Sequence, residues 1–305
     1  MPLRIRLLVI RNPVAGLRRG RLFEKVMRRL TDTGCRITLR ETWQRGDAEL
    51  YARAATPLEF DAVVAAGGDG TINEVANGLA GRNVALAILP LGTANVLATE
   101  IGLPVRAKAI ARTILRGQDR AIRVGLVNGR RFTLMAGVGF DAHVVRRVTP
   151  WLKRRLGRNA YVLESLREIL RHRGLRYPIS LDGRPTDAAS LIVANGRHYA
   201  GPYVAAPNAS LTDDSLHAVQ FLRDGRWNCI RYGLALLRNR FGSMPDIRID
   251  PVQTVEIQEP AGEPVQGDGD IIAVLPARIS LDPEPLRLIV PRRSPLQRRE
   301  DSARR

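Results

Sequence analysis

The sequence predicts a protein of two domains: an α/β domain with a parallel sheet, followed by a mostly antiparallel β-sandwich domain. Its 305 residues are about twice the length of a typical domain. Strand-like and helix-like segments alternate from the N-terminus to residue 116, which is the pattern of a parallel sheet covered by helices. After residue 122, short strand-like runs separated by turn signals are typical of a sandwich or an open barrel.

The elements of the N-terminal domain are predicted by local patterns. Apolar residues recur at helical spacing between Arg21 and Leu30, whereas "LRIRLLVI" and "VALAILP" are apolar strand-like runs. The predicted strands are 3–10, 36–42, 61–66 and 84–90, and the predicted helices are 21–30, 47–55, the segment after the glycine loop at 67–70, and segments that reach residue 116. Glycine-bearing loops follow Ile10, Ala66 and Pro90. Since ligands of parallel sheets bind at the carboxyl ends of the strands, we expect these loops to converge on one ligand.

The C-terminal domain is expected to begin with a hairpin, because Asn128-Gly129 separates two strand-like runs. A basic helical insert follows at 142–176. The later predicted strands are 177–181, 189–194, 216–222, 252–258, 271–275, 278–281 and 286–290. We therefore predict a first domain at 1–122 and a β-rich second domain at 123–285. A C-terminal segment, 286–305, could return to the first domain and ends in a mobile tail.

The formal net charge of +18 is the strongest compositional signal. It suits a polyanionic partner, and an arginine-rich genome is the alternative cause. Residues 143–176 carry ten Lys and Arg against two Glu, with Trp151, Leu152 and Leu156 among them. Basic residues around an interfacial aromatic side chain favour an anionic membrane surface, and a solvated helical face is the alternative. The aromatic share of 5% and the lack of a recognised motif argue against nucleic acid as a partner.

The sequence also bears on location. No stretch approaches the roughly 20 uninterrupted apolar residues of a membrane span, and the start "MPLRIRLLVIRNP" has no signal-peptide pattern. The two cysteines, Cys35 and Cys229, do not form a disulfide framework. We therefore expect a cytoplasmic protein with reduced thiols.

The segment "VVAAGGDGTINEVANGL", residues 63–79, carries a glycine loop between a predicted strand and a predicted helix. Glycines let the backbone approach a phosphate, and the amides at the start of the helix point at it. Thr71 and Glu74 predict a capping box at that start. Asp69 lies among the glycines, where a carboxylate is useful if Mg²⁺ lies between it and the phosphates, or if it accepts a proton from an attacking hydroxyl. The alternative is a tight turn without a ligand.

Several motifs together resemble the diacylglycerol kinase catalytic-domain family, which comprises bacterial diacylglycerol and other lipid kinases and is related to sphingosine and ceramide kinases. These motifs are "NPVAG", "TWQRGDA", "GGDGTINEVANGL", "LPLGTANVLA", "AGVGFDA", "VANGRHYAGPYVAAPNASLTDD" and "VQGDGD". The resemblance spans almost the whole chain. It implies a first domain like that of NAD kinases and phosphofructokinases, an ATP site in that domain, and a lipid substrate held by the second domain.

Matching positions imply site residues. Those that would contact ATP are Asn12, Thr42, Gly68, Asp69, Gly70, Thr71, Asn73, Glu74 and Thr93. Those that match the ligands of a structural Mg²⁺ are Ser210, Asp213 and Ser215, through the side chain of Asp213 and two backbone carbonyls. The matching catalytic acids are Asp268 and Asp270, with Asp69 as a further candidate. Asp268 is the first choice for the base and Asp69 is its rival, although "QGDGD" also predicts a simple hairpin turn.

Four positions depart from the family pattern, of which Asp214 for the usual Gly and Asp270 for the usual Glu are the smaller departures. Val96 and Arg123 stand where relatives often carry acids of a network around a catalytic Mg²⁺. The resemblance still implies an ATP- and Mg²⁺-dependent lipid kinase, peripheral at the inner membrane face, acting on diacylglycerol, phosphatidylglycerol, a sphingoid base or ceramide. The alternatives are a non-catalytic lipid- or nucleotide-binding protein, suggested by Val96 and Arg123, and a soluble kinase of NAD or a sugar. The resemblance leaves the oligomeric state open, with a homodimer as one alternative.

Overall fold

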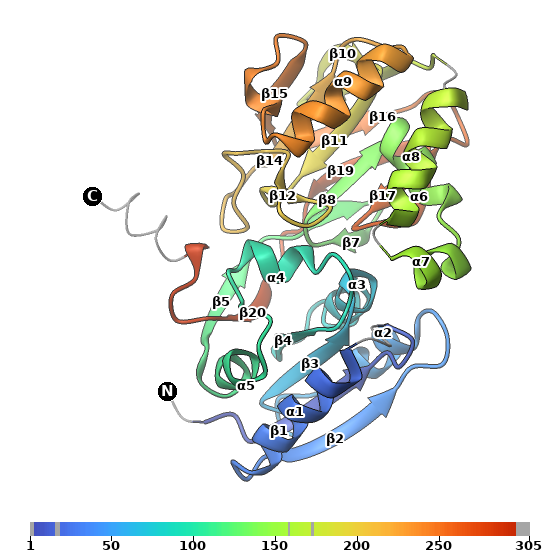
Figure 1. The fold of residues 1–305 in the computed structure, drawn as a ribbon. Coiled ribbons are helices and arrows are strands. Elements are labelled where there is room, and N and C mark those ends of the chain that lie inside the picture. Colours follow the sequence, from blue (N-terminus) through green and yellow to red (C-terminus); the bar gives the residue numbers. More distant parts are fainter. Residues whose placement is uncertain (1–2, 16–18, 158, 172–173, 297–305) are drawn as a thin grey trace. The chain divides into compact units, whose positions relative to one another are not determined.

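A computed structural model describes residues 3–15, 19–157, 159–171 and 174–296. The chain divides into two compact units (Figure 1). The first comprises the chain up to Arg123 and the segment from Pro283 onward, and the second comprises Val124–Asp282. The predicted fold class, a parallel α/β unit and an antiparallel β-rich unit, is confirmed. The tail expected to be mobile, 297–305, lies outside the described residues.

The sheet of the first unit has the strand order β2-β1-β3-β4-β20-β5. Its strands are β1 (Arg6–Arg11), β2 (Arg36–Glu41), β3 (Ala62–Gly67), β4 (Ala85–Pro90), β5 (Gln118–Ile122) and β20 (Leu286–Val290). The first four are parallel, and β20 lies parallel to β4 and antiparallel to β5. Every residue of β3 and β4 is buried, as expected for strands covered on both faces. Gly67 pairs with Pro90, so the two strands end level with each other.

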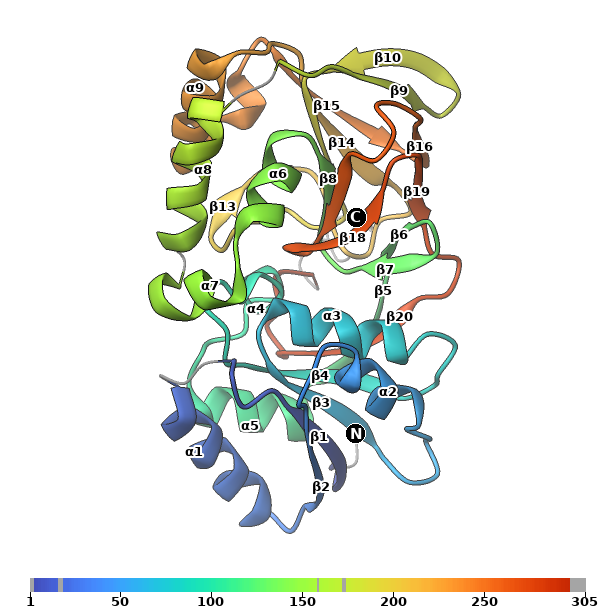
Figure 2. The same ribbon diagram turned by 90° about the vertical axis from the view of Figure 1, so that its right-hand side faces the viewer.

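Helices cover both faces of this sheet (Figures 1 and 2). They are α1 (Gly20–Thr31), α2 (Asp47–Arg53), α3 (Asp69–Gly78), α4 (Val96–Glu100) and α5 (Ala107–Arg116). Helix α1 packs beside α5 on one face, and α2 packs beside α3 on the other. The α2–α3 approach is close, because a Cβ on Gly78 would lie 2.3 Å from the carbonyl oxygen of Glu49. This packing holds the start of α3 against the end of β3.

The second unit contains two six-stranded antiparallel sheets and a two-stranded one. One sheet has the order β10-β9-β16-β19-β6-β7, comprising β6 (Gly125–Val127), β7 (Arg130–Phe132), β9 (Tyr177–Leu181), β10 (Arg184–Ala188), β16 (Thr254–Ile257) and β19 (Ala277–Leu281). The other has the order β15-β14-β11-β8-β17-β18, comprising β8 (Met135–Val138), β11 (Ser190–Ala194), β14 (Leu216–Phe221), β15 (Ile247–Val252), β17 (Pro264–Gly267) and β18 (Asp270–Val274). The small sheet pairs β12 (His198–Tyr199) with β13 (Tyr203–Val204). Phe132 and Tyr177 are the largest side chains of the buried core to which both six-stranded sheets contribute.

The basic insert forms three helices, α6 (Phe140–Arg147), α7 (Pro150–Leu156) and α8 (Asn159–Arg171). A further helix, α9 (Arg226–Leu237), follows β14, and the short 3₁₀ helix η2 (Phe241–Ser243) precedes β15. Among the described residues, no helix has the length and apolar character needed to cross a membrane.

Candidate active site

The ends of β3 and β4 form a cradle of bare backbone in the first unit. The N–H groups of Leu91 and Gly92 both donate to the carbonyl of Gly67, at 2.8 and 3.2 Å. A Cβ on Gly92 would lie 2.5 Å from the Cα of Gly68, closer than real Cβ atoms approach a neighbour. The two glycine loops therefore touch through their backbones. A surface of this kind lets phosphate oxygens approach main-chain amides without hindrance.

The carboxylate of Asp69 joins the same two loops. Its Oδ1 accepts a hydrogen bond from the backbone N–H of Val96, at 2.8 Å. Asp69 is the first residue of α3, and Val96 is the first residue of α4. A carboxylate at a helix N-terminus is electrostatically favourable. Asp69 therefore has a definite structural role, to which any contact with phosphate or metal would be added.

The predicted capping box is wrong. Helix α3 begins at Asp69 rather than after Thr71, with Gly68 in an extended conformation at the N-cap and no side-chain cap. The carboxylate of Glu74 instead accepts the N–H of Ala48 at 3.2 Å, which ties α3 to α2. The helix starts early because Gly68 can take the cap position and the Asp69 carboxylate favours the first turn.

Four predicted residues lie in or beside helix α3. Asn12, directly after β1, donates from Nδ2 to the Thr71 hydroxyl at 3.3 Å. Its Oδ1 accepts the N–H groups of Val14 and Ala15, which closes the loop after β1. Asn73 is buried in α3, and Gly70 lies in the first turn of that helix. The structure thus brings the loop after β1 and the first turn of α3 together.

Thr42 and Thr93 occupy two other loops of this unit. Thr42 is buried after β2, and its N–H donates to the carbonyl of Arg11 at 2.9 Å. Thr93 is exposed on the loop after β4. Arg19, which precedes α1, donates to the carbonyl of Pro90 at 3.1 Å, so a cation reaches the end of β4. The neighbouring Arg18, a second candidate to neutralise phosphate charge, lies outside the described residues.

Asn95 is a candidate that the sequence analysis missed. It is buried in a left-handed conformation, with φ of 49°, and its Nδ2 donates to the carbonyl of Gly92 at 2.8 Å. Its Oδ1 has no hydrogen-bond partner among the described residues. That oxygen would lie 3.0 Å from a Cβ on Gly92, so it is at the cradle itself. A buried acceptor without a donor suits a cation or a ligand hydroxyl better than it suits phosphate oxygens. Its presence in "PLGTAN" was the available signal.

Asp268, in the second unit, holds a turn together. It follows β17 with φ of 50°, and its two oxygens accept four hydrogen bonds of 2.6 to 3.1 Å. The donors are the N–H groups of Thr133, Leu134 and Met135 and the hydroxyl of Thr133. A carboxylate offers about four acceptor positions, so these donors use them all. Asp270 begins β18, opposite Gly267, and is half-buried.

The residues matched to a structural Mg²⁺ lie together on the loop before β14. The N–H of Asp213 donates to the carbonyl of Ser210 at 3.0 Å, and the Ser210 hydroxyl lies 2.9 Å from that of Thr212. A carbonyl retains a second lone pair after one such bond. The described residues contain no group of three or more His, Cys, Asp or Glu that could hold a metal. One carboxylate with backbone carbonyls is a different donor set, and its all-oxygen chemistry suits a hard cation.

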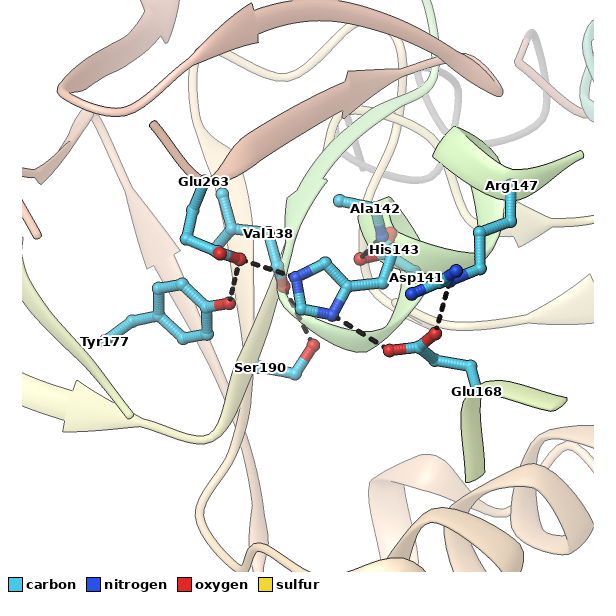
Figure 3. Close-up of polar contacts among 9 residues, drawn as sticks. All are labelled: Val138, Asp141, Ala142, His143, Arg147, Glu168, Tyr177, Ser190 and Glu263. Carbon is cyan, nitrogen blue, oxygen red and sulfur yellow. Dashed lines mark hydrogen bonds and ion pairs between the residues drawn. The ribbon is translucent and has the colours of Figure 1, made fainter. Parts of the chain in front are cut away.

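A polar cluster in the second unit was not predicted (Figure 3). His143 lies between two carboxylates, with Nδ1 3.2 Å from Glu168 Oε1 and Nε2 2.5 Å from Glu263 Oε2. Arg147 donates to Glu168 at 2.9 Å, and the Tyr177 hydroxyl donates to Glu263 at 3.1 Å. Burial, followed by the nearby Glu263 charge, raises the pKa of Tyr177. A cavity of about 410 Å³ lies at this cluster, and its lining residues are His143, Arg146, Arg147, Glu168 and Glu263.

Asp141 lies beside this cluster at the start of α6. Burial raises the pKa of its carboxyl to about 7, and the hydrogen bonds from Gln266, at 3.0 Å, and from the N–H of Ala142, at 2.8 Å, oppose that rise. No sequence pattern predicted the cluster, because its partners are as far as 120 residues apart.

Comparison with known proteins defines the class. Residues 6–127 match the model of the diacylglycerol kinase catalytic domain, and residues 135–290 match that of the YegS C-terminal NAD kinase beta sandwich-like domain. Among solved structures, that of a diacylglycerol kinase from Bacillus anthracis str. Sterne is similar, with a TM-score of 0.75 and 25% identity over 95% of this chain and 98% of that one. A parallel α/β unit with a glycine cradle, joined to this sandwich, is the architecture of a lipid kinase.

Curated relatives narrow the class to a family. A probable lipid kinase YegS-like protein of Pseudomonas aeruginosa (strain UCBPP-PA14) is 34% identical over 97% of this chain and 98% of its own length. A similar protein of Enterobacter sp. (strain 638) is 31% identical over 96% and 98%. A diacylglycerol kinase of Mycobacterium tuberculosis (strain ATCC 25618 / H37Rv) is 32% identical over 81% and 82%. The chain belongs to the diacylglycerol kinase and YegS family of lipid kinases.

Proposed function

We propose that this lipid kinase uses ATP to phosphorylate a hydroxyl of diacylglycerol or of a related lipid, namely phosphatidylglycerol, a sphingoid base or ceramide, at a membrane surface. The observation that carries the proposal is the backbone contact between Gly68 and Gly92. The contact places the loop after β4 against the start of α3, where the first N–H groups of the helix have no partner within the helix, and phosphates bind such amides.

The ATP phosphates would lie on this cradle. Helix α3 starts there, so its N-terminal dipole and amides favour negative charge. Asn12 and Thr71, joined by a hydrogen bond, would border the phosphates on the side of β1, and the exposed Thr93 would border them on the side of β4. Arg19, held by the carbonyl of Pro90, would add positive charge.

Mg²⁺ would neutralise charge that develops on the transferred phosphoryl group. In the first unit, the buried Asn95 Oδ1 and the Asp69 carboxylate are oxygen donors from neighbouring loops. In the second unit, Asp213 with the carbonyls of Ser210 and Ser215 would hold a structural Mg²⁺. A structural ion is tested without an activity assay: Mg²⁺ should raise the thermal unfolding midpoint of the wild type more than that of Asp213→Asn, which keeps only the donors of the first unit.

A carboxylate must accept the proton of the lipid hydroxyl. Asp268 is the first choice, with Asp270 as its partner, and Asp69 is the rival. Asp268 would have to lose one of its four hydrogen bonds before it could accept that proton. Asp69 would accept the proton on a carboxylate that also accepts the N–H of Val96. The two assignments predict different variants to be inactive, as developed in the Discussion.

The acceptor is identified by labelling. Purified protein is incubated with [γ-³²P]ATP, Mg²⁺ and vesicles that contain each candidate lipid, and in parallel with NAD or a sugar. Label in the chloroform phase supports the proposal, and the lipid that yields most product is the substrate. Label only in a water-soluble acceptor would replace it with a soluble kinase. We further propose that the protein works in the cytoplasm, peripherally at the inner membrane face.

A further inference from the structure

Helix α8 has its polar and apolar faces inverted. Its two acids, Glu164 and Glu168, are each only 4% exposed. Its apolar side chains Val162, Leu166 and Leu170 point outward, and Leu170 is 68% exposed. These three residues recur every four positions, so they form one stripe along the helix. A surface helix normally places such a stripe against the core.

The contacts of the buried acids fix the rotation of α8 about its own axis. Glu168 accepts Arg147 and lies against His143, and Glu164 accepts Arg167 at 2.6 Å. Glu168 belongs to α8, whereas its partners His143 and Arg147 belong to α6, so a rotation of α8 that buried the leucines would break these contacts. The inversion is therefore fixed by the polar cluster, and the outward leucines have no cover within the described chain.

Helix α9 carries a second stripe of the same kind. Trp227, Ile230, Leu234 and Leu237 recur at helical spacing and are all exposed, with Trp227 at 75%. Helix α9 contacts α8, and α8 contacts α7, where Trp151 is also exposed. Figure 2 shows α7, α8 and α9 along one side of the second unit. Exposed apolar side chains gathered on neighbouring helices are typical of an interaction site.

The charges around the stripes have one sign. The sequences of the three helices contain only two acids, and both are the buried glutamates of α8. Among the side chains of these helices that the structure describes, the exposed arginines are Arg155, Arg167, Arg171 and Arg226, and the exposed Arg238 directly follows α9. Arg155 lies over the ring of Trp151, 5.1 Å from its centroid. Apolar stripes flanked by arginine and tryptophan match the interface of an anionic bilayer.

We propose that the exposed apolar stripes of α8 and α9 dock the protein on an anionic lipid bilayer. This inference rests on the proposed function, because it identifies the surface by which the kinase reaches its lipid. A second copy of the chain suits the surface less well. A two-fold contact through it would set arginines against arginines, and the only acids in the sequences of α7, α8 and α9 are the two buried glutamates of α8.

Vesicle flotation tests the proposal. The wild type should float with vesicles of phosphatidylcholine and phosphatidylglycerol, bind pure phosphatidylcholine more weakly, and lose binding as salt is raised. The double variant Leu166→Asn/Leu170→Asn removes apolar area without removing charge, and its affinity for the mixed vesicles should fall roughly tenfold for each leucine. Leu58→Asn, at an 86% exposed leucine of the first unit, is the matched control and should bind like the wild type.

Tryptophan fluorescence gives a second readout. In Trp43→Phe/Trp151→Phe, only Trp227 remains, since the chain has three tryptophans. Its emission should shift to shorter wavelength when mixed vesicles are added, as expected for an indole that enters the interface. An unshifted emission, or equal flotation of the double variant and the wild type, would overturn the docking surface.

Two further measurements separate this inference from its alternatives. Phosphorylation of a short-chain, water-dispersed diacylglycerol should be the same in the double variant and the wild type, because no bilayer is needed there. Loss of that activity in the wild type would count against the proposed function, not against the surface. A wild-type dimer in light scattering that the double variant converts to a monomer would instead assign the surface to a second copy.

Discussion

The Asp69 carboxylate accepts the backbone N–H of Val96 at 2.8 Å, so the one acid in the glycine loop is tied to the start of the next helix. This bond gives a physical reason for an acid in a phosphate cradle. It fixes the loops after β3 and β4 relative to each other, and it positions a negative oxygen beside the buried Asn95. Val96 contributes its N–H to the same arrangement.

Two substitutions of Asp69 separate the effect of losing its negative charge from the effect of losing its hydrogen bond to Val96. Asp69→Asn keeps an oxygen that can accept the Val96 N–H, so stability and ATP affinity should be close to wild type while phosphoryl transfer falls at least about a hundredfold. Asp69→Ala also leaves a buried N–H without a partner, which should cost about 1–3 kcal/mol of unfolding free energy. Denaturant unfolding, ATP titration and kinase rates check the three quantities. Activity of either variant near that of the wild type would reduce the loop to a tight turn.

Gly92→Ala should damage the cradle directly. Its Cβ would lie 2.5 Å from the Cα of Gly68, and relief of such overpacking costs about 1–3 kcal/mol. The loops must separate, so ATP affinity should fall. Gly20→Ala is the matched control in the same unit, because a Cβ there meets nothing within 4 Å. Isothermal titration with ATP distinguishes the two, and equal affinities would remove the phosphate role of this contact.

Substitution of Asp268 and substitution of Asp270 should have different effects on the free energy of unfolding. Asp268→Asn replaces a four-bond acceptor by a group with one acceptor oxygen, so it should destabilise the turn by roughly 1–3 kcal/mol as well as impair turnover. Asp270→Asn, at the start of β18, should lower the unfolding free energy less than Asp268→Asn does. Thermal and denaturant unfolding measure the first effect, and labelling of lipid measures the second. A stable, active Asp268→Asn would transfer the base to Asp69.

Stability should depend on pH through Asp141. Burial raises the pKa of this carboxyl from 3.8 to about 7 in the folded protein. The folded state therefore holds a proton that the unfolded state has released, and the stabilisation is complete below pH 3.8 and is lost as pH rises through about 7. The full difference corresponds to about 4 kcal/mol. Asp141→Asn cannot titrate, so its unfolding free energy should vary less between pH 5 and pH 8 in buffered denaturant titrations. Parallel pH profiles for the two proteins would contradict the assignment.

Much of the first unit could be predicted, because each buried parallel strand is a short apolar run in the sequence. The apolar runs at 36–42, 61–66 and 84–90 became β2, β3 and β4 with bounds shifted by at most one residue. The run at 252–258 was predicted as one strand, yet it spans the end of β15 and all of β16, which belong to different sheets. Helix α9 was missed because its apolar residues are not confined to one face: Tyr232 and Ala235 are buried, whereas the residues of the stripe are exposed.

The contacts that define the site join residues far apart in the sequence, so no local sequence pattern indicates them. Asp268 meets Thr133 across 135 positions of the sequence, and His143 meets Glu263 across 120. Such pairs depend on how the sheets fold, which spacing along the chain does not encode. Asn95 was present in a quoted motif, but only its left-handed backbone and its unpartnered oxygen single it out. The capping box failed because Gly68 could take the N-cap position before Thr71 did.

The most direct test of the central claim is transfer of label from [γ-³²P]ATP to diacylglycerol in mixed micelles, by wild type, Gly20→Ala and Gly92→Ala in parallel. If the glycine loops of the first unit hold the ATP that phosphorylates a lipid, the first two proteins will yield chloroform-soluble label at similar rates, and Gly92→Ala will yield at least about tenfold less at limiting ATP. Measurable ATP binding by the wild type without label in any lipid, or full activity of Gly92→Ala, would contradict it.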